Sequence, residues 1–156
     1  VPDGRYPKEG ARIMSLDDPT NKMSKSAENE MSRISLLDEP AKIKKAIMKA
    51  TTDSGGVIRF DEENKKGVSN LMTIYSSLEN IGMEELQKRY EGAGYGTFKK
   101  DLVDIVTTSL EPIRKRFLEI RESDELIKIL KDGEERANAI AEPVLKRVKD
   151  TVGLGI

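Results

Sequence analysis

The chain has 156 residues, the usual length of one domain or of one domain with an appendage. Its 27 Lys and Arg nearly balance its 28 Asp and Glu, which excludes a uniformly basic nucleic-acid coat and an acidic disordered tail, but not a local basic patch. The absence of Cys and His excludes a disulfide scaffold, a zinc site of thiolates or imidazoles, a cysteine nucleophile and a histidine general base. Any chemistry must therefore use Lys, Arg, carboxylates, hydroxyls or backbone amides.

Targeting and membrane segments are not expected. No apolar run approaches the roughly 18 residues of a membrane span, and residues 1–4 lack the basic and apolar regions of a signal peptide. The absence of Cys fits a reducing compartment. We therefore expect a cytoplasmic protein with no membrane partner.

The first 37 residues differ in composition and apolar spacing from the rest of the chain. Prolines, glycines and small polar residues predict a loop up to about residue 30, with one short apolar run at 11–16 that we interpret as a buried strand. Residues 33–37 read as a second extended piece. The N-terminal part is therefore predicted to be mostly irregular.

From Pro40 onward the pattern is helical. Apolar residues at offsets of three and four predict helices over 40–50, 68–78, 83–90, 97–120, 123–130 and 134–152. We expect Thr97 to be the N-cap of the long fourth helix and Pro112 to kink it. Each helix has one apolar stripe that must be buried against another, so the fold class is mainly α, a helical bundle preceded by a short strand and loop. The last helix is expected to bury Ala137, Ile140, Ala141, Val144, Leu145, Val148 and Val152.

Packing does not explain residues 17–26, which contain the sequence K-M-S-K-S at 22–26. The ammonium groups of Lys22 and Lys25 are compact charges suited to anionic oxygens, Ser24 and Ser26 offer hydroxyl donors, and backbone amides in a turn can form an anion-binding nest. This pattern favours a polyphosphate ligand. The alternative is a solvated surface loop that happens to be basic.

K-M-S-K-S resembles the second signature of class I aminoacyl-tRNA synthetases, and its surroundings resemble those of tryptophanyl-tRNA synthetases. The similar segments occur in order over essentially the whole chain, at residues 10–16, 34–38, 52–61, 67–71 with Tyr75, 95–99 and 110–114. The resemblance implies ATP-dependent activation of tryptophan to tryptophanyl-adenylate, followed by transfer to tRNA(Trp).

The resemblance also implies roles for individual residues. Lys22 and Lys25 would be catalytic, because they stabilise negative charge on the departing pyrophosphate. The implied ATP-binding residues are Ile13, Lys22, Met23, Ser24, Lys25 and Ser26. Mg²⁺ would accompany ATP and be held through its phosphates, with no metal ligand expected from this chain.

The family's first signature, related to H-I-G-H, is absent from this sequence. We therefore expect a C-terminal fragment, inactive alone, with the tryptophan pocket and most of a parallel sheet upstream of Val1. Residues 1–37 would be the end of a Rossmann-like catalytic core with the K-M-S-K-S loop, and residues 38–156 a helical domain of the anticodon-binding type. Family members form homodimers through the missing core, so a monomer is the expectation for this chain alone.

Basic clusters at 99–100, 114–116 and 146–149 could contact tRNA phosphates, although the acidic residues around them favour solvated helix faces. Core packing is likewise favoured over base stacking for four aromatic residues, Tyr75, Tyr90, Phe98 and Phe117. Two alternatives to a tRNA-charging enzyme remain. One is a nucleotidyl transferase of the same superfamily that acts on another small acid, and the other is a non-catalytic helical module that binds RNA or a protein partner.

Overall fold

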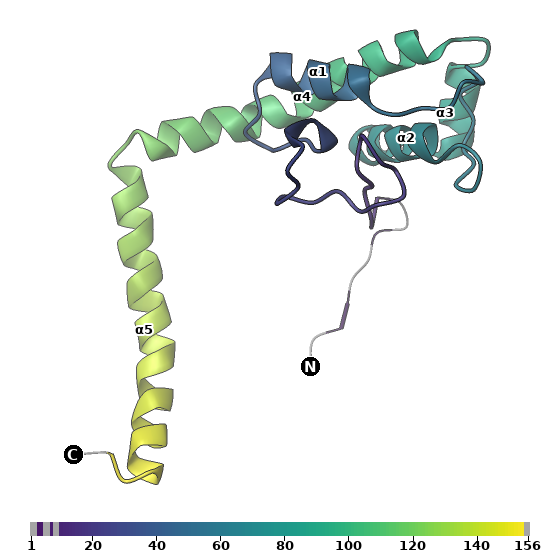
Figure 1. The fold of residues 1–156 in the computed structure, drawn as a ribbon. Coiled ribbons are helices and arrows are strands. Elements are labelled where there is room, and N and C mark those ends of the chain that lie inside the picture. Colours follow the sequence, from purple (N-terminus) through teal and green to yellow (C-terminus); the bar gives the residue numbers. More distant parts are fainter. Residues whose placement is uncertain (1–2, 5–6, 8–9, 155–156) are drawn as a thin grey trace. The chain divides into compact units, whose positions relative to one another are not determined.

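Five α-helices make up most of the chain in the computed structural model, which describes residues 3–4, 7 and 10–154 (Figure 1). The elements are a 3-10 turn η1 (Glu30–Ser32) and the helices α1 (Pro40–Lys49), α2 (Lys66–Glu79), α3 (Met83–Arg89), α4 (Tyr95–Arg121) and α5 (Glu125–Thr151). The chain divides into two units, residues 1–114 and 115–156, and the division falls inside α4. The mainly α prediction is confirmed.

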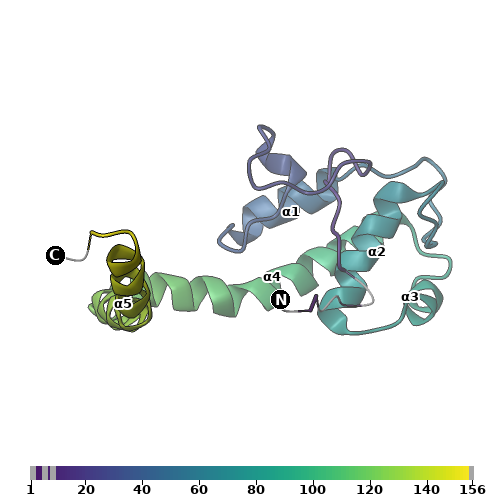
Figure 2. The ribbon, with the colours of Figure 1, turned by 90° about the horizontal axis from the view of Figure 1, so that it is seen from below.

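The first unit has one hydrophobic core, built by α1, α2, α3 and the first part of α4 (Figures 1 and 2). The predicted apolar stripes of these helices provide most of it, together with Leu16 from the N-terminal segment and Ile58 from the connection between α1 and α2. Its most buried large side chains are Phe98, Leu16, Ile43, Ile47, Leu71, Met72, Leu86 and Leu102. The prediction that these helices bury their stripes against one another is therefore confirmed for the first unit.

Three aromatic rings lie at the centre of this core. The ring centroids of Tyr75 and Phe98 are 5.8 Å apart, and those of Tyr90 and Phe98 are 5.0 Å apart. The Tyr90 hydroxyl donates to Asp101 at 2.8 Å, and burial raises the pKa of this tyrosine. Core packing of these rings is thus confirmed, and none of the three is available to stack a base. The same prediction is wrong for Phe117, which is 40% exposed.

The helix limits follow local chemistry in most places. Pro40 occupies the first turn of α1, as expected, since its missing N–H is not needed there. Asn80 ends α2 in the left-handed conformation with a φ of 53°. The N-cap prediction for Thr97 is wrong, because α4 already begins at Tyr95, whose hydroxyl donates to Asp53 at 2.6 Å. The helix thus starts two residues before the expected cap, and the N–H of Phe98 already donates to the carbonyl of Gly94.

The strand expected at 11–16 is reduced to a single antiparallel bridge between Met14 and Lys22. No longer strand forms among the described residues. The segment has only a short partner, because the chain turns back at Asp18 and leaves the pairing again after Met23.

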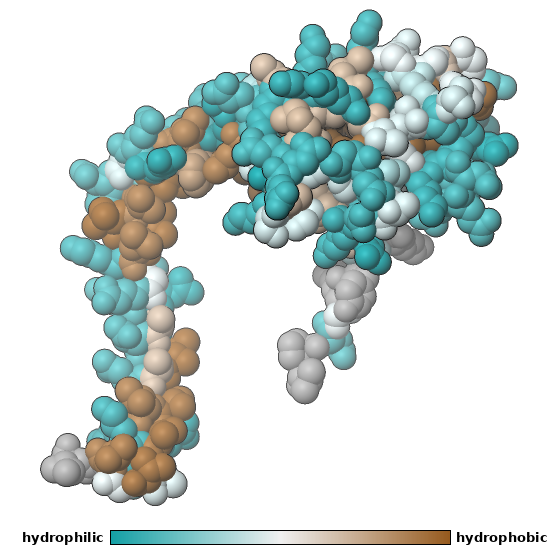
Figure 3. Space-filling model, in the orientation of Figure 1, coloured by the Kyte–Doolittle hydropathy of each residue, from teal (hydrophilic) through white to brown (hydrophobic). Residues whose placement is uncertain are grey.

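The C-terminal region differs from the prediction in two ways. Residues 125–151 form one continuous helix, because Gly133 is accommodated within α5 instead of ending a helix. No residue of α5 is buried, and Ile140 and Val148 are 75% and 53% exposed. The apolar stripe appears as brown surface along α5 (Figure 3). The predicted buried face is therefore wrong for α5.

The two longest helices, α4 and α5, have 27 residues each, which by length alone would cross a bilayer. However, no helix in the described part of the chain has a stretch apolar enough to span a membrane.

Candidate nucleotide-binding loop

Residues 17–29, which we name the lysine loop, form a mostly exposed loop of the first unit that starts with a tight turn. The carboxylate of Asp18 accepts from the backbone N–H of Thr20 at 3.0 Å and from the side-chain amide of Asn21 at 2.7 Å. Hydrogen bonds from the Thr20 hydroxyl and its N–H lower the pKa of Asp18. This turn, with Pro19 inside it, reverses the chain ahead of the first lysine.

After the turn, residues 21–23 pair with residues 13–15. The N–H of Ser15 donates to the carbonyl of Asn21 at 2.8 Å, and the N–H of Met23 donates to the carbonyl of Ile13 at 3.0 Å. Lys22 therefore lies directly opposite Met14. The pairing brings together two predicted ATP-binding residues, Ile13 and Met23, which are both half-buried.

The two lysines of the motif are exposed cations. Neither ammonium group forms a hydrogen bond or an ion pair with any part of the chain that the structure describes. Between them the chain turns again, with the hydroxyls of Ser24 and Ser26 3.2 Å apart and the N–H of Ser26 donating to Ser24 Oγ at 3.3 Å. The loop thus offers two lysine charges that no described residue pairs with, next to two hydroxyls that lie within hydrogen-bond distance of each other.

The base of the lysine loop is closed. The Asn29 side-chain amide donates to Asp17 Oδ2 at 2.6 Å, and the N–H of Leu16 donates to the carbonyl of Ser32 at 2.8 Å. Hydrogen bonds from Ser15 and Asn29 lower the pKa of the Asp17 carboxyl. An exposed loop with a closed base can move without disturbing the core beneath it.

An open hollow of about 600 Å³ lies beside the loop, lined by Met23, Ser24, Lys25, Arg33, Lys42 and residues 34–38. Lys42 pairs with Glu30 at 2.9 Å and Asp38 at 3.1 Å, and Arg33 donates to the carbonyl of Ala27 at 2.7 Å. Lys25 is therefore the cation of this hollow that remains unpaired among the described residues. Lys22 does not line it.

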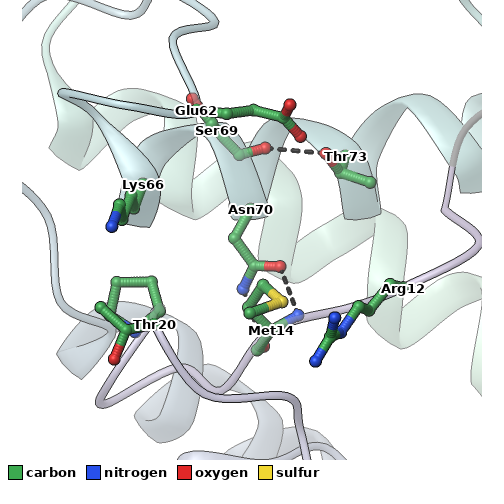
Figure 4. A pocket seen from close by; sticks show the side chains of 9 residues that line it. Arg12, Met14, Thr20, Glu62, Lys66, Ser69, Asn70 and Thr73 are labelled. Carbon is green, nitrogen blue, oxygen red and sulfur yellow. Dashed lines mark hydrogen bonds between the residues drawn. The ribbon is translucent and has the colours of Figure 1, made fainter.

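Two anchoring residues were missed by the reasoning from sequence. Thr51 donates from its N–H to the carbonyl of Leu16 at 2.7 Å and from its hydroxyl to the carbonyl of Asp17 at 2.6 Å. Asn70 reaches from α2 to the backbone of Met14, beside a smaller hollow of about 300 Å³ (Figure 4). Asn70 could have been identified from sequence, because it is a polar residue within an otherwise apolar helical stripe.

The basic clusters of the helices differ from one another. Lys99 is buried, and its ammonium donates to the carbonyl of Ala50 at 2.7 Å, beyond the end of α1. Burial lowers the pKa of Lys99. Both interpretations of Lys99, the favoured solvated helix face and the phosphate contact, are therefore wrong, whereas Lys100 and residues 146–149 are exposed.

The chain is similar to known proteins along nearly its full length. The family described as "tRNA synthetases class I (W and Y)" matches residues 1–111. The tryptophan–tRNA ligase of Bacillus subtilis (strain 168) is 54% identical over 155 residues, which cover 99% of this chain and 47% of that protein. The ligase of Bacillus anthracis is 50% identical over 154 residues, with the same two shares. The chain thus spans about half the length of these relatives.

Solved structures agree with this similarity. The crystal structure of tryptophanyl-tRNA synthetase from Mycoplasma pneumoniae has a TM-score of 0.78 and 33% identity, over 96% of this chain and 45% of that one. The Campylobacter jejuni enzyme complexed with ADP and tryptophan has a TM-score of 0.73 and 31% identity, over 96% of this chain and 46% of its own.

Proposed function

Because this chain belongs to the class I tRNA synthetases for tryptophan and tyrosine, we propose that it is the C-terminal half of a tryptophan–tRNA ligase. The full-length protein would activate tryptophan with ATP to tryptophanyl-adenylate, release pyrophosphate and transfer the amino acid to tRNA(Trp). Tryptophan is favoured over tyrosine because the similar curated proteins are tryptophan–tRNA ligases at 50–54% identity.

One observation carries this role for the lysine loop. Lys22 and Lys25 are exposed cations, and neither forms an ion pair with a described residue. We assign both to the β- and γ-phosphates of ATP, where charge grows as pyrophosphate leaves. Fixed charges aimed at developing negative charge typically contribute a factor of about 10²–10³ in rate each. No proton transfer is needed from these residues.

The remaining contacts to ATP are assigned to the neighbours of the lysines. Ile13 would contact the adenine side, and Met23, Ser24 and Ser26 would line the nucleotide. One similar structure holds ADP and tryptophan, which is consistent with a nucleotide bound by this family. Among the residues described, no group of three or more acidic side chains could hold a metal ion, so we assign Mg²⁺ to the ATP phosphates and derive no step through it.

The division of labour along the chain is part of the proposal. Residues 1–37 would complete a Rossmann-like catalytic core that lies mostly upstream, and residues 38–156 would form a helical domain of the anticodon-binding type. The full-length protein would act as a homodimer, and we propose a cytoplasmic location, where its ATP and tRNA substrates are found. The isolated chain would be inactive, because it spans only about half the length of the tryptophan–tRNA ligases that it resembles.

The test is tryptophan-dependent exchange of pyrophosphate into ATP by the full-length protein. Lys25→Ala should lower the exchange rate about 10²–10³-fold. Lys45→Ala, which removes an exposed lysine of α1, should leave the rate within twofold of wild type. Equal rates for Lys25→Ala and Lys45→Ala would remove the role assigned to the loop.

Two further measurements separate the ligase from the alternative functions. Exchange that depends on tyrosine or another small acid instead of tryptophan would identify a different nucleotidyl transferase. Retention of tRNA on a filter without any exchange would favour a non-catalytic RNA-binding module. We expect exchange with tryptophan alone, together with tRNA retention.

A further inference from the structure

Asn70 is a buried amide in the middle of an apolar helix. Its exposed fraction is 5%, and its neighbours on α2 include Val68, Leu71 and Met72, which are 0–1% exposed. A buried polar side chain is costly unless its hydrogen-bonding groups are satisfied. The partners of this amide therefore indicate why an asparagine occupies the position.

Both polar atoms of the Asn70 side chain bind the backbone of one residue, Met14. Its Oδ1 accepts from the N–H of Met14 at 2.8 Å, and its Nδ2 donates to the carbonyl of Met14 at 2.8 Å. Figure 4 shows the side chain pointing from α2 toward Met14. The carboxamide thus replaces the peptide group that a neighbouring strand would otherwise present.

The other edge of this segment is the lysine loop. Met14 and Lys22 face each other as a non-hydrogen-bonded pair, because the flanking bonds run from Ser15 to Asn21 and from Met23 to Ile13. The N–H and carbonyl of Met14 therefore point away from Lys22 and toward α2, where Asn70 binds both. Met14 is therefore the one residue that separates the backbone of Lys22 from the side chain of Asn70 on α2.

We propose that Asn70 is a positioning residue that sets the location of Lys22 relative to the helical core. Asn70 holds the backbone of Met14, and the bonds on either side of Met14, from Ser15 to Asn21 and from Met23 to Ile13, hold the backbone on either side of Lys22. This inference rests on the proposed function, because it concerns where the lysine meets the phosphates. A misplacement of about 1 Å can cost as much as 10²-fold in rate, so a single buried amide can control the reaction.

The test compares Asn70→Asp with Ser69→Ala in the full-length protein. In Asn70→Asp, assayed at pH 8 to favour the ionised carboxylate, the side chain accepts from the N–H of Met14 but presents a second acceptor to the Met14 carbonyl, so one of the two bonds is lost. Ser69→Ala removes a buried hydrogen bond of the same helix, from the N–H of Asp61 at 2.8 Å, and does not touch Met14. We expect Asn70→Asp to lower kcat for ATP–pyrophosphate exchange about tenfold with an unchanged KM for tryptophan, and Ser69→Ala to change kcat less than twofold.

A double-mutant cycle separates positioning from general destabilisation. If Asn70 acts through Lys22, the Asn70→Asp substitution should lower exchange less than twofold when Lys22 is already alanine. A structural role would give the same tenfold factor in both backgrounds, and that result would overturn the inference.

Trypsin cleavage of the loop tests the role of Asn70 without any measurement of catalysis, so its outcome is independent of the proposed enzyme function. Trypsin cleavage after Lys22 should be about tenfold faster in Asn70→Asp than in wild type or Ser69→Ala, because the loop edge opens more often. If wild type shows no tryptophan-dependent exchange, the proposed function fails, and the cleavage rates still decide the anchoring of the loop. Equal cleavage of all three proteins would overturn the positioning role.

Discussion

The first part of α4 and the whole of α5 have the same kind of sequence and opposite environments. Both have apolar residues at helical offsets of three and four. In α4, Phe98, Leu102 and Val106 are at most 2% exposed, whereas in α5 Ile140 is 75% exposed and Val144 is 47% exposed. Periodicity therefore identifies an apolar face but not what covers it.

The two stripes differ in burial because each unit supplies different apolar partners. The α4 stripe meets the stripes of α1, α2 and α3, and its Phe98 ring packs against Tyr75 of α2 and Tyr90 at the end of α3. The second unit contains only the end of α4 and α5, with residues such as Phe117 remaining 40% exposed. Helix stability in proteins comes mainly from the packing of such faces, so the two helices should respond differently to substitution.

The largest expected effect is at the centre of the core. Phe98→Ala should lower the free energy of unfolding by about 3–5 kcal/mol, because it removes a fully buried ring and leaves a cavity between Tyr75 and Tyr90. The same truncation principle applied to the α5 face predicts that Ile140→Ala changes it by less than about 0.5 kcal/mol.

Urea unfolding followed by tyrosine fluorescence measures both variants, since the sequence has no tryptophan. A cost for Ile140→Ala close to that of Phe98→Ala would show that the α5 face is covered in solution. The contrast between the two helices would then disappear.

The next effect concerns how closely the helices approach the base of the lysine loop. A Cβ atom at Gly67 would overlap the backbone carbonyl of Thr51, the residue that anchors Leu16 and Asp17. Gly67→Ala should therefore destabilise the fold by about 1–3 kcal/mol in the same unfolding measurement.

Gly96 is a matched control for Gly67. Both glycines are the second residue of a helix, but a Cβ atom at Gly96 meets nothing within 4 Å. Gly96→Ala should be neutral or stabilising, by up to about 1 kcal/mol. Similar losses at both positions would mean that helix conformation, and not the close approach to Thr51, sets the requirement for glycine.

The smallest effect depends on pH and concerns the start of α4. Burial alone raises the pKa of Asp53, but hydrogen bonds from Tyr95, Lys65 and the N–H of Gly55 outweigh it and lower the pKa to about 2. Ionised Asp53 therefore stabilises the fold above about pH 4, and this contribution is lost as the pH falls through 2. Asp53→Asn should cost about 2 kcal/mol at pH 6 and less than half of that at pH 2.5.

Urea midpoints at the two pH values measure this loss. Asp104→Asn is the control, because it removes an exposed carboxylate of α4 that forms no hydrogen bond or ion pair with the described residues. Its difference from wild type should not change between pH 6 and pH 2.5. A constant cost for Asp53→Asn would show that the carboxylate is not held in its charged form by these partners.

Much of the fold and of the candidate site could be predicted from sequence. The positions of α1, α2 and α3 followed from apolar spacing and helix-breaking residues, and the lysine loop followed from its local motif. The residues that hold the loop did not, because Thr51 and Asn70 lie 29 and 48 positions after Lys22 and contact only its supporting backbone. The continuity of α5 through Gly133 was missed because one glycine weakens a helix without ending it.

The sequence by itself determined which residues are apolar along each helix, where most helices begin and end, and which exposed loop holds two cations. Those properties depend on neighbours along the chain, within a few turns. Only the tertiary structure decided which stripe is buried, that Lys99 is bound to the end of α1, and that an amide from α2 supports the backbone opposite Lys22. Each of these depends on contacts between distant segments, which local periodicity does not encode.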